Sequence, residues 1–356
     1  MNDKTSNKPI TKAKDNPWYI LATLYGQPQS SNEDLHSRNR MIWNRLVVPV
    51  LTTDQRVSLV NMDAKNREYM TPLSAEEFSS VEIAFFHRHK SLGSEANCIL
   101  PSLETKIDFS YVEFDHVFCA RGFLFPQKEN SFKGSIFRED SDFSQAHFFG
   151  DARFRGAIFC KFAFFTDAKF SIAAYFESAK FLKTADFSNI VVSGNAFFML
   201  TEFSEEAVFF GSELCIMAWF INSKFKGRAH FNGIKFKNGI FAQAKFNEDA
   251  YFSNSKFSGD ANFNSAVFSK EAAFKGIEIF EHSTFDDVRF LGKTSFVNVN
   301  MKGPTTFENS LFKYSPPVFF GAKLHEGTVW RGVTWPNIPK DSKEAGEFVD
   351  AYERLK

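Results

Sequence analysis

Phenylalanine recurs at alternating steps of five and six residues over more than half of this chain of 356 residues. In the stretch DARFRGAIFCKFAFFTDAKF, four phenylalanines follow one another at steps of five, six and five: Phe154, Phe159, Phe165 and Phe170. The series begins near Ser131, loses one residue near Phe241 and reaches Phe312, with an occasional aliphatic residue keeping the register. A combined period of eleven residues held this long requires a repeat architecture.

Two positions before most of these phenylalanines stands a small residue, often alanine, as in Ala152, Ala163 and Ala174. Helical heptads need apolar steps of three and four, and these are absent. A steady alternation typical of long strands is absent as well. Short strands with a corner after each unit remain, and on a strand two residues that are two apart point to the same side. We therefore expect the alanines and phenylalanines to face a common interior.

The repeated unit, A-x-F-x-x with an extra residue in every second copy, resembles the Phe-centred branch of the bacterial pentapeptide-repeat family, whose unit is commonly A-[DN]-L-x-x. The resemblance covers roughly residues 131–324. It implies a mainly β fold, a right-handed quadrilateral β-helix with the small and large apolar residues inside. Alternating steps give about 22 residues per four-sided coil in place of about 20, so we expect an extra residue at two of the four corners.

The rest of the chain divides around this solenoid. We expect a disordered tail over residues 1–16 and the β-helix over 108–330. The open strand edges at the two ends of the rod need cover. We therefore expect a partly helical N-terminal region over 17–107 that caps or flanks the rod, and a C-terminal capping helix over 331–356. Helices are predicted over 31–46 and 71–89, the second with Thr71 as N-cap and Pro72 in the first turn. The sequence ends at Lys356 without a helix-stop signal, which leaves a longer natural chain or pairing with another chain open.

The balance of charges and the absence of long apolar segments limit the possible partners. The chain carries 42 basic and 42 acidic residues, without a basic arm, so we do not expect direct binding of nucleic acid. We find neither a signal-like apolar core nor a run of about 18 apolar residues, so we expect a cytoplasmic protein without a membrane segment. The four cysteines lack metal or disulfide spacing.

Signs of catalysis are few. The sequence LGKTSF resembles the end of a phosphate-binding loop, but Asp287 stands where its first glycine is needed. A metal site at His87, His89 and Cys98 lacks a fourth ligand, and His36 has no evident nucleophile beside it. Three histidines of the repeats are expected to be exposed: His147, His230 and His282. We therefore predict that the protein is not an enzyme and has no catalytic, cofactor or metal site.

The outward positions give a stronger signal. The residue just before each core phenylalanine faces out, and alignment of every second eleven-residue unit collects apolar residues on one side of the rod. This predicts a partner-binding strip made of Tyr175, Phe197, Met199, Trp219, Ile221 and Ile240. Three interpretations stay open: cover by the N-terminal region, self-association, or another protein partner.

Two other sides carry basic residues among acidic ones. One has Lys180, Glu202, Lys224, Lys245 and Arg289, and another has Lys169, Lys235 and Lys256. A solvated face is favoured, with weak contact to anions or nucleic acid as the alternative.

We therefore predict a non-catalytic protein-binding or self-assembly scaffold built on a rigid β-helix. The family resemblance implies an alternative, a DNA-mimicking modulator of a type II topoisomerase such as gyrase. That mechanism requires an acidic rod, whereas this chain is balanced. Two further alternatives are an enzyme or sensor with its site in residues 17–107 and a regulatory or sensor module of a longer protein.

Overall fold

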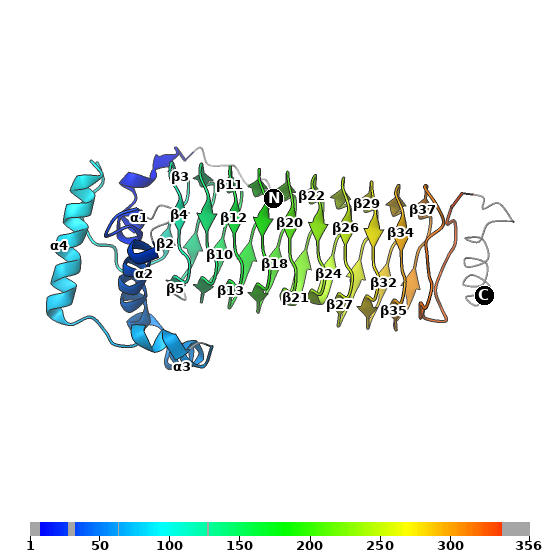
Figure 1. Cartoon of the computed structure of the whole chain (residues 1–356), viewed down its shortest axis with the longest axis horizontal. Coiled ribbons are helices and arrows are strands. Elements are labelled where there is room, and N and C mark those ends of the chain that lie inside the picture. Colours follow the sequence, from blue (N-terminus) through cyan, green and yellow to red (C-terminus); the bar gives the residue numbers. More distant parts are fainter. Residues whose placement is uncertain (1–7, 28–32, 63, 127, 337–356) are drawn as a thin grey trace.

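The structure, a computed structural model, describes residues 8–27, 33–62, 64–126 and 128–336. Helices gather at the N-terminal end of a straight rod of short strands (Figure 1). Each coil of the rod contains four strands, and each strand pairs in parallel with the strand one coil further on. Ala152, for example, pairs with Asn130 on one side and Ala174 on the other. The rod is a β-solenoid of about nine turns with about 22 residues per coil, so the predicted fold is confirmed.

Four columns of strands form the four faces of the rod. The first face consists of β2 (Ile107–Asp108), β6 (Asn130–Ser131), β10 (Ala152–Arg153), β14 (Ala174–Tyr175), β18 (Ala196–Phe197), the ends of β21 (Glu213–Trp219) and β24 (Lys235–Ile240), β28 (Ala261–Asn262), β32 (Ser283–Thr284) and β36 (Thr305–Thr306). The second face consists of β3 (Val112–Phe114), β7 (Ile136–Phe137), β11 (Ile158–Phe159), β15 (Lys180–Phe181), β19 (Glu202–Phe203), β22 (Lys224–Phe225), β25 (Lys245–Phe246), β29 (Val267–Phe268), β33 (Arg289–Phe290) and β37 (Leu311–Phe312).

The other two faces close the square. The third face consists of β4 (Phe118–Cys119), β8 (Ser141–Asp142), β12 (Ala163–Phe164), β16 (Ala185–Asp186), β20 (Ala207–Val208), β23 (Ala229–His230), β26 (Ala250–Tyr251), β30 (Ala272–Ala273) and β34 (Thr294–Ser295). The fourth face consists of β5 (Leu124–Phe125), β9 (His147–Phe148), β13 (Lys169–Phe170), β17 (Val191–Val192), the starts of β21 and β24, β27 (Lys256–Phe257), β31 (Glu278–Ile279) and β35 (Asn300–Met301).

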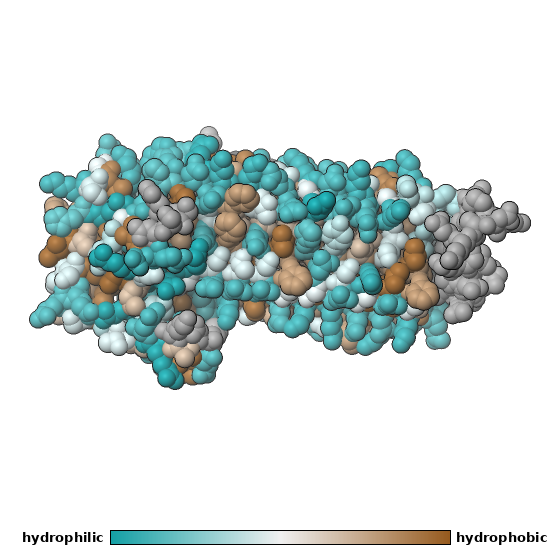
Figure 2. All heavy atoms as spheres, viewed as in Figure 1, coloured by the Kyte–Doolittle hydropathy of each residue, from teal (hydrophilic) through white to brown (hydrophobic). Residues whose placement is uncertain are grey.

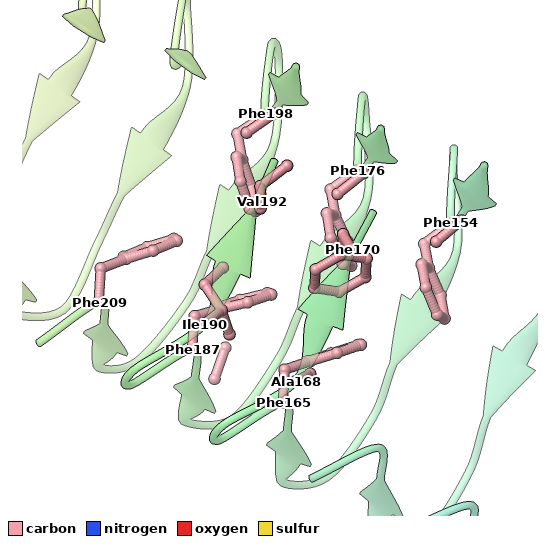
Figure 3. Close-up of a cluster of buried hydrophobic side chains, with 14 of the residues drawn as sticks. Phe154, Phe165, Ala168, Phe170, Phe176, Phe187, Ile190, Val192, Phe198 and Phe209 are labelled. Atoms are coloured by element: carbon pink, nitrogen blue, oxygen red, sulfur yellow. The ribbon is translucent and has the colours of Figure 1, made fainter. Parts of the chain in front are cut away.

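The interior is filled by stacked phenylalanine rings. Phe154 and Phe176 lie one coil apart with ring centroids 4.9 Å apart and planes 3° apart. Rings from opposite faces meet edge to face, as Phe165 and Phe176 do at 5.2 Å and 88°. Figure 3 shows these columns converging on the axis of the rod. Stacked and edge-to-face rings are favourable arrangements of aromatic quadrupoles, so phenylalanine can fill most of a square core.

The alternation of five and six comes from two kinds of corner. At a five-residue step the chain makes a two-residue turn, closed by a 2.9 Å hydrogen bond from the Ala157 amide to the Phe154 carbonyl. The second turn residue, here Gly156, has a φ of 65°, as a type II turn requires. At a six-residue step three residues, such as those between Phe159 and Ala163, round the corner as a bend. The extra corner residues expected at two of the four corners are therefore present.

The residue missing near Phe241 is lost from one such bend. Only Lys237 and Asn238 separate Phe236 from Gly239, which stands at the usual alanine position. A Cβ on Gly239 would lie 2.5 Å from Cε1 of Phe257, so the tightened corner admits only glycine.

The N-terminal region covers the open strand edges of the first coil. Its elements are β1 (Thr11–Lys12), η1 (Ala13–Asp15), α1 (Pro17–Ala22), α2 (Glu33–Val47), η2 (Val48–Val50), α3 (Thr53–Met62), η3 (Ala64–Tyr69) and α4 (Ala75–Ser91). Strand β1 pairs with β3. Asn44 of α2 accepts a 2.9 Å hydrogen bond from the Leu124 amide and donates one of 3.0 Å to the Gly122 carbonyl. Trp43 stacks on Phe123 and donates to the Leu124 carbonyl.

Several expectations about the ends need correction. Residues 8–16 are not a disordered tail, because β1 joins the sheet and Asn16 donates to the Asp108 carbonyl. The N-cap of α4 is Ser74, not Thr71, since Ser74 forms a capping box with Glu77. Helices α1 and α3 were not predicted. At the other end the coil continues to a bridge at Thr334, and most of the predicted helix over 331–356 lies outside the described residues.

Candidate protein-binding face

The outward side chains of the first face form a stack of rings parallel to the core stacks. Tyr175 and Phe197 have ring centroids 4.7 Å apart and planes 8° apart, and Phe197 and Trp219 are 4.7 Å and 10° apart. Ile240 pairs with Trp219 on the next coil, and the Arg153 guanidinium lies 5.3 Å from the centroid of the Tyr175 ring. We call Tyr175, Phe197, Trp219 and Ile240 the aromatic ladder.

The ladder follows directly from the period of the chain. Its members directly precede core residues on successive coils, and the in-register parallel pairing brings them side by side. Because each ring is held by its neighbours, the side chains are fixed before any partner arrives, which lowers the entropy cost of binding.

Corner residues widen the apolar surface on both sides of the ladder. Met199 and Ile221 are half-buried at the turn from the first to the second face, as the sequence predicted. Three more exposed residues, which were not predicted, lie beside them: Leu200, Ile172 and Ile216, with 61%, 44% and 48% of their surface exposed. The ladder and these five corner residues together make the apolar face.

Leu200 is unusual in its backbone as well as its exposure. Its φ is 59°, in the left-handed region that leucine rarely adopts. The equivalent positions of other coils are mostly Gly, Asn, Asp, Ser or Gln. Strain held at an exposed apolar side chain points to a role for that side chain beyond folding.

The described N-terminal residues lie at the end of the rod and not along the ladder (Figure 1). Their contacts fall on the first coil, through Asn16, Trp43 and Asn44. The view in Figure 2 shows one side of the rod, where hydrophobic side chains stand in small groups between hydrophilic ones.

The basic residues of the second and fourth faces are interleaved with acids. Lys226 bonds to Glu202 and Lys235 to Glu213 across neighbouring coils. Hydrogen bonding to Lys226 lowers the pKa of Glu202. Exposed pairs of this kind contribute little to stability, and no unbroken cationic stripe results.

The loop-like sequence LGKTSF is ordinary repeat. Thr294 and Ser295 form β34, and Phe296 stacks on Phe274 in the core. A Cβ on Gly292 would lie 2.2 Å from the carbonyl oxygen of Lys270, so this glycine is needed for the close approach of two coils.

His36 has a neighbour that the sequence did not reveal. Its Nδ1 lies 3.3 Å from Sγ of Cys119, while its Nε2 bonds to the Arg121 carbonyl. Burial raises the pKa of Cys119 to about 11 and lowers the pKa of His36. Both groups are therefore neutral near pH 7, and the thiol is not an activated nucleophile.

The proposed metal ligands do not form a cluster. Among the residues that the structure describes, no group of three His, Cys, Asp or Glu side chains could hold a metal ion. Nε2 of His89 donates instead to the Ala96 carbonyl at 2.8 Å.

The expectation for the repeat histidines is wrong at His147. Its ring is buried, stacks 3.8 Å from Phe149 and bonds to Ser171. Burial lowers the pKa of His147 to about 3. His282 is exposed and His230 is half-buried.

Four short parallel strands per coil, a two-residue turn at alternate corners and an alanine–phenylalanine interior define the class of solenoid built from five-residue repeats. Residues 231–278 match the family model described as pentapeptide repeats (9 copies). This match confirms the resemblance to the pentapeptide-repeat family that the repeat unit shows. The match lies within the rod and includes the corner shortened at Gly239.

No curated protein and no solved structure matches the chain. None of the described helices combines the length and the apolar character that crossing a membrane requires.

Proposed function

We propose that this protein is a non-catalytic scaffold whose rigid β-helix binds protein through the apolar face. The observation that carries the proposal is the stacked ladder of Tyr175, Phe197 and Trp219 on an outward surface. Aromatic side chains fixed on a flat sheet provide large contact area with little conformational entropy to lose, and such residues often anchor interfaces.

Leu200 supports the same conclusion. A fold-only role would favour Asn or Gly at a φ of 59°, and those residues occupy many equivalent corners. The chain instead places an exposed leucine beside the ladder, where it enlarges the apolar surface.

A pull-down tests the proposal. The bait is the full chain, compared with the double variant Phe197→Glu, Trp219→Glu and with a matched control, Tyr251→Glu, which changes an outward aromatic residue of the third face. Light scattering on the eluates measures self-association in the same samples. We expect a bound protein, either another protein or a second copy, that the double variant loses and the control keeps. Identical eluates from all three baits would overturn the proposal.

A further inference from the structure

The outward residues of the first face have a symmetric order around the ladder. From β2 to β36 they are Asp108, Ser131, Arg153, Tyr175, Phe197, Trp219, Ile240, Asn262, Thr284 and Thr306, and Val329 follows on the last coil. Three polar residues flank the four ladder residues on each side. The midpoint of the ladder therefore lies between Phe197 and Trp219.

A two-fold axis through this midpoint, perpendicular to the rod, superimposes apolar on apolar. It places Phe197 opposite Trp219 of a second copy, and Tyr175 opposite Ile240. At the corner beside the ladder it sets Met199 against Ile221. An isologous contact requires such self-complementarity, because each residue must suit its symmetry mate.

The net charge along that corner reverses in sign across the midpoint. The turn residues on the N-terminal side include Lys133, Arg155 and Glu177, which are net basic, whereas those on the C-terminal side include Asp286, Asp287, Glu308 and Arg331, which are net acidic. The same two-fold axis sets Lys133 against the aspartates of the second copy. A parallel arrangement would not bring these charges together, so charge complementarity selects the antiparallel one.

We propose that the apolar face binds a second copy of this chain, forming an antiparallel dimer centred between Phe197 and Trp219. The proposal rests on the proposed function, because it names the partner of the same face. Four coils spaced about 4.8 Å apart make the ladder about 19 Å long. A standard interface buries about 800 Å² on each partner, so contact extends beyond the ladder to the charged corners.

Charge reversal tests the partner and its direction together. In sedimentation velocity over a concentration series, wild type forms a dimer. Lys133→Glu alone and Asp287→Lys alone each weaken it about ten-fold, because each homodimer then has two like-charge contacts. An equimolar mixture of the two variants regains the wild-type constant to within about three-fold, because the mixed dimer has two opposite-charge contacts. Circular dichroism checks that both variants remain folded.

A matched pair controls for unspecific charge effects. Lys161→Glu and Glu271→Lys reverse exposed charges at the corner between the second and third faces, and neither should change the dimer. A dimer that the single variants weaken but mixing does not restore would overturn the antiparallel arrangement.

The outcome separates this inference from the proposed function. If wild type stays monomeric at about 100 μM, the dimer proposal is overturned. The proposed function still holds in that case if the double variant Phe197→Glu, Trp219→Glu abolishes capture of another protein. If the double variant Phe197→Glu, Trp219→Glu still forms the dimer, the dimer proposal is overturned as well. The pull-down then tests whether the apolar face binds another protein.

Discussion

The rings of Phe197 and Trp219 lie 22 positions apart in the chain, and their centroids are 4.7 Å apart in the structure, with planes at 10°. This stack stands outside the core, parallel to the buried column in which Phe198 and Phe220 stack at 4.9 Å. One backbone period thus builds two aromatic columns, one that stabilises the rod and one that faces outward. Substitutions in the two columns should therefore have different effects.

Truncation of a core ring should be costly. Phe187 is fully buried and packs against rings of the coils on both sides, so Phe187→Ala should lower the free energy of unfolding by about 3–5 kcal/mol. Phe164→Ala, at a half-buried outward position, should cost less than about 1 kcal/mol. Chemical denaturation measures both. Equal losses would contradict the assignment of inner and outer columns.

Relief of strain at Leu200 should stabilise the fold and weaken association. Leu200→Asn places a residue suited to a φ of 59° at that corner, so the free energy of unfolding should rise by about 1 kcal/mol. The same change removes an exposed apolar side chain from the face, so binding should weaken. Leu182→Asn is the control, since Leu182 is exposed at a corner without a positive φ. Unchanged binding by Leu200→Asn would remove this residue from the interface.

Loss of the N-terminal cap should destabilise the first coil. Asn44→Ala leaves the Leu124 amide and the Gly122 carbonyl without their partner, at a cost of about 1–3 kcal/mol for each buried group. The exposed strand edge should also promote aggregation. Thermal unfolding followed by light scattering measures both effects, with Asn247→Ala at an exposed corner as the control. A variant as stable as that control would show that the edge is protected in another way.

The buried imidazole of His147 should make stability fall as the solution is acidified. The unfolded chain takes up a proton near pH 6.5, whereas the pKa of His147 in the folded chain is about 3. Protons therefore favour unfolding between these values, by at most about 1.4 kcal/mol per pH unit. His147→Gln should flatten the loss of stability between pH 7 and 5. Equal slopes in wild type and His147→Gln would show that His147 is protonated in the folded chain.

The rod could be predicted because its folding code is local and repeated. Each side of the square needs one large ring, as at Phe154, and one small residue, as at Ala152, so the interior is visible in the spacing alone. The extra corner residues follow from the same count. One failure inside the rod, the burial of His147, depends on the stacking of Phe149, which breaks the repeat pattern at that corner.

The N-terminal cap could not be predicted in the same way. Asn16 bonds to a carbonyl 92 residues away, and Trp43 to one 81 residues away, so no local pattern marks them. The apolar face was found only in part. Leu200 could have been identified from the sequence, because Gly and Asn dominate the second turn position and a leucine there is an exception. Ile172 and Ile216 lie in three-residue bends. The residue types at these bends vary from coil to coil, so the aligned repeats do not predict which side chains are exposed there.

The most direct test of the binding face is hydroxyl-radical footprinting of wild type at concentrations below and above association. The face contains three readily oxidised side chains, Tyr175, Met199 and Trp219, and Tyr251 on the third face serves as an internal reference. We expect oxidation of the three to fall in the associated state, while oxidation of Tyr251 does not change. Protection that is absent from all three, or that appears at Tyr251 instead, would contradict the assignment of the aromatic ladder as the binding surface.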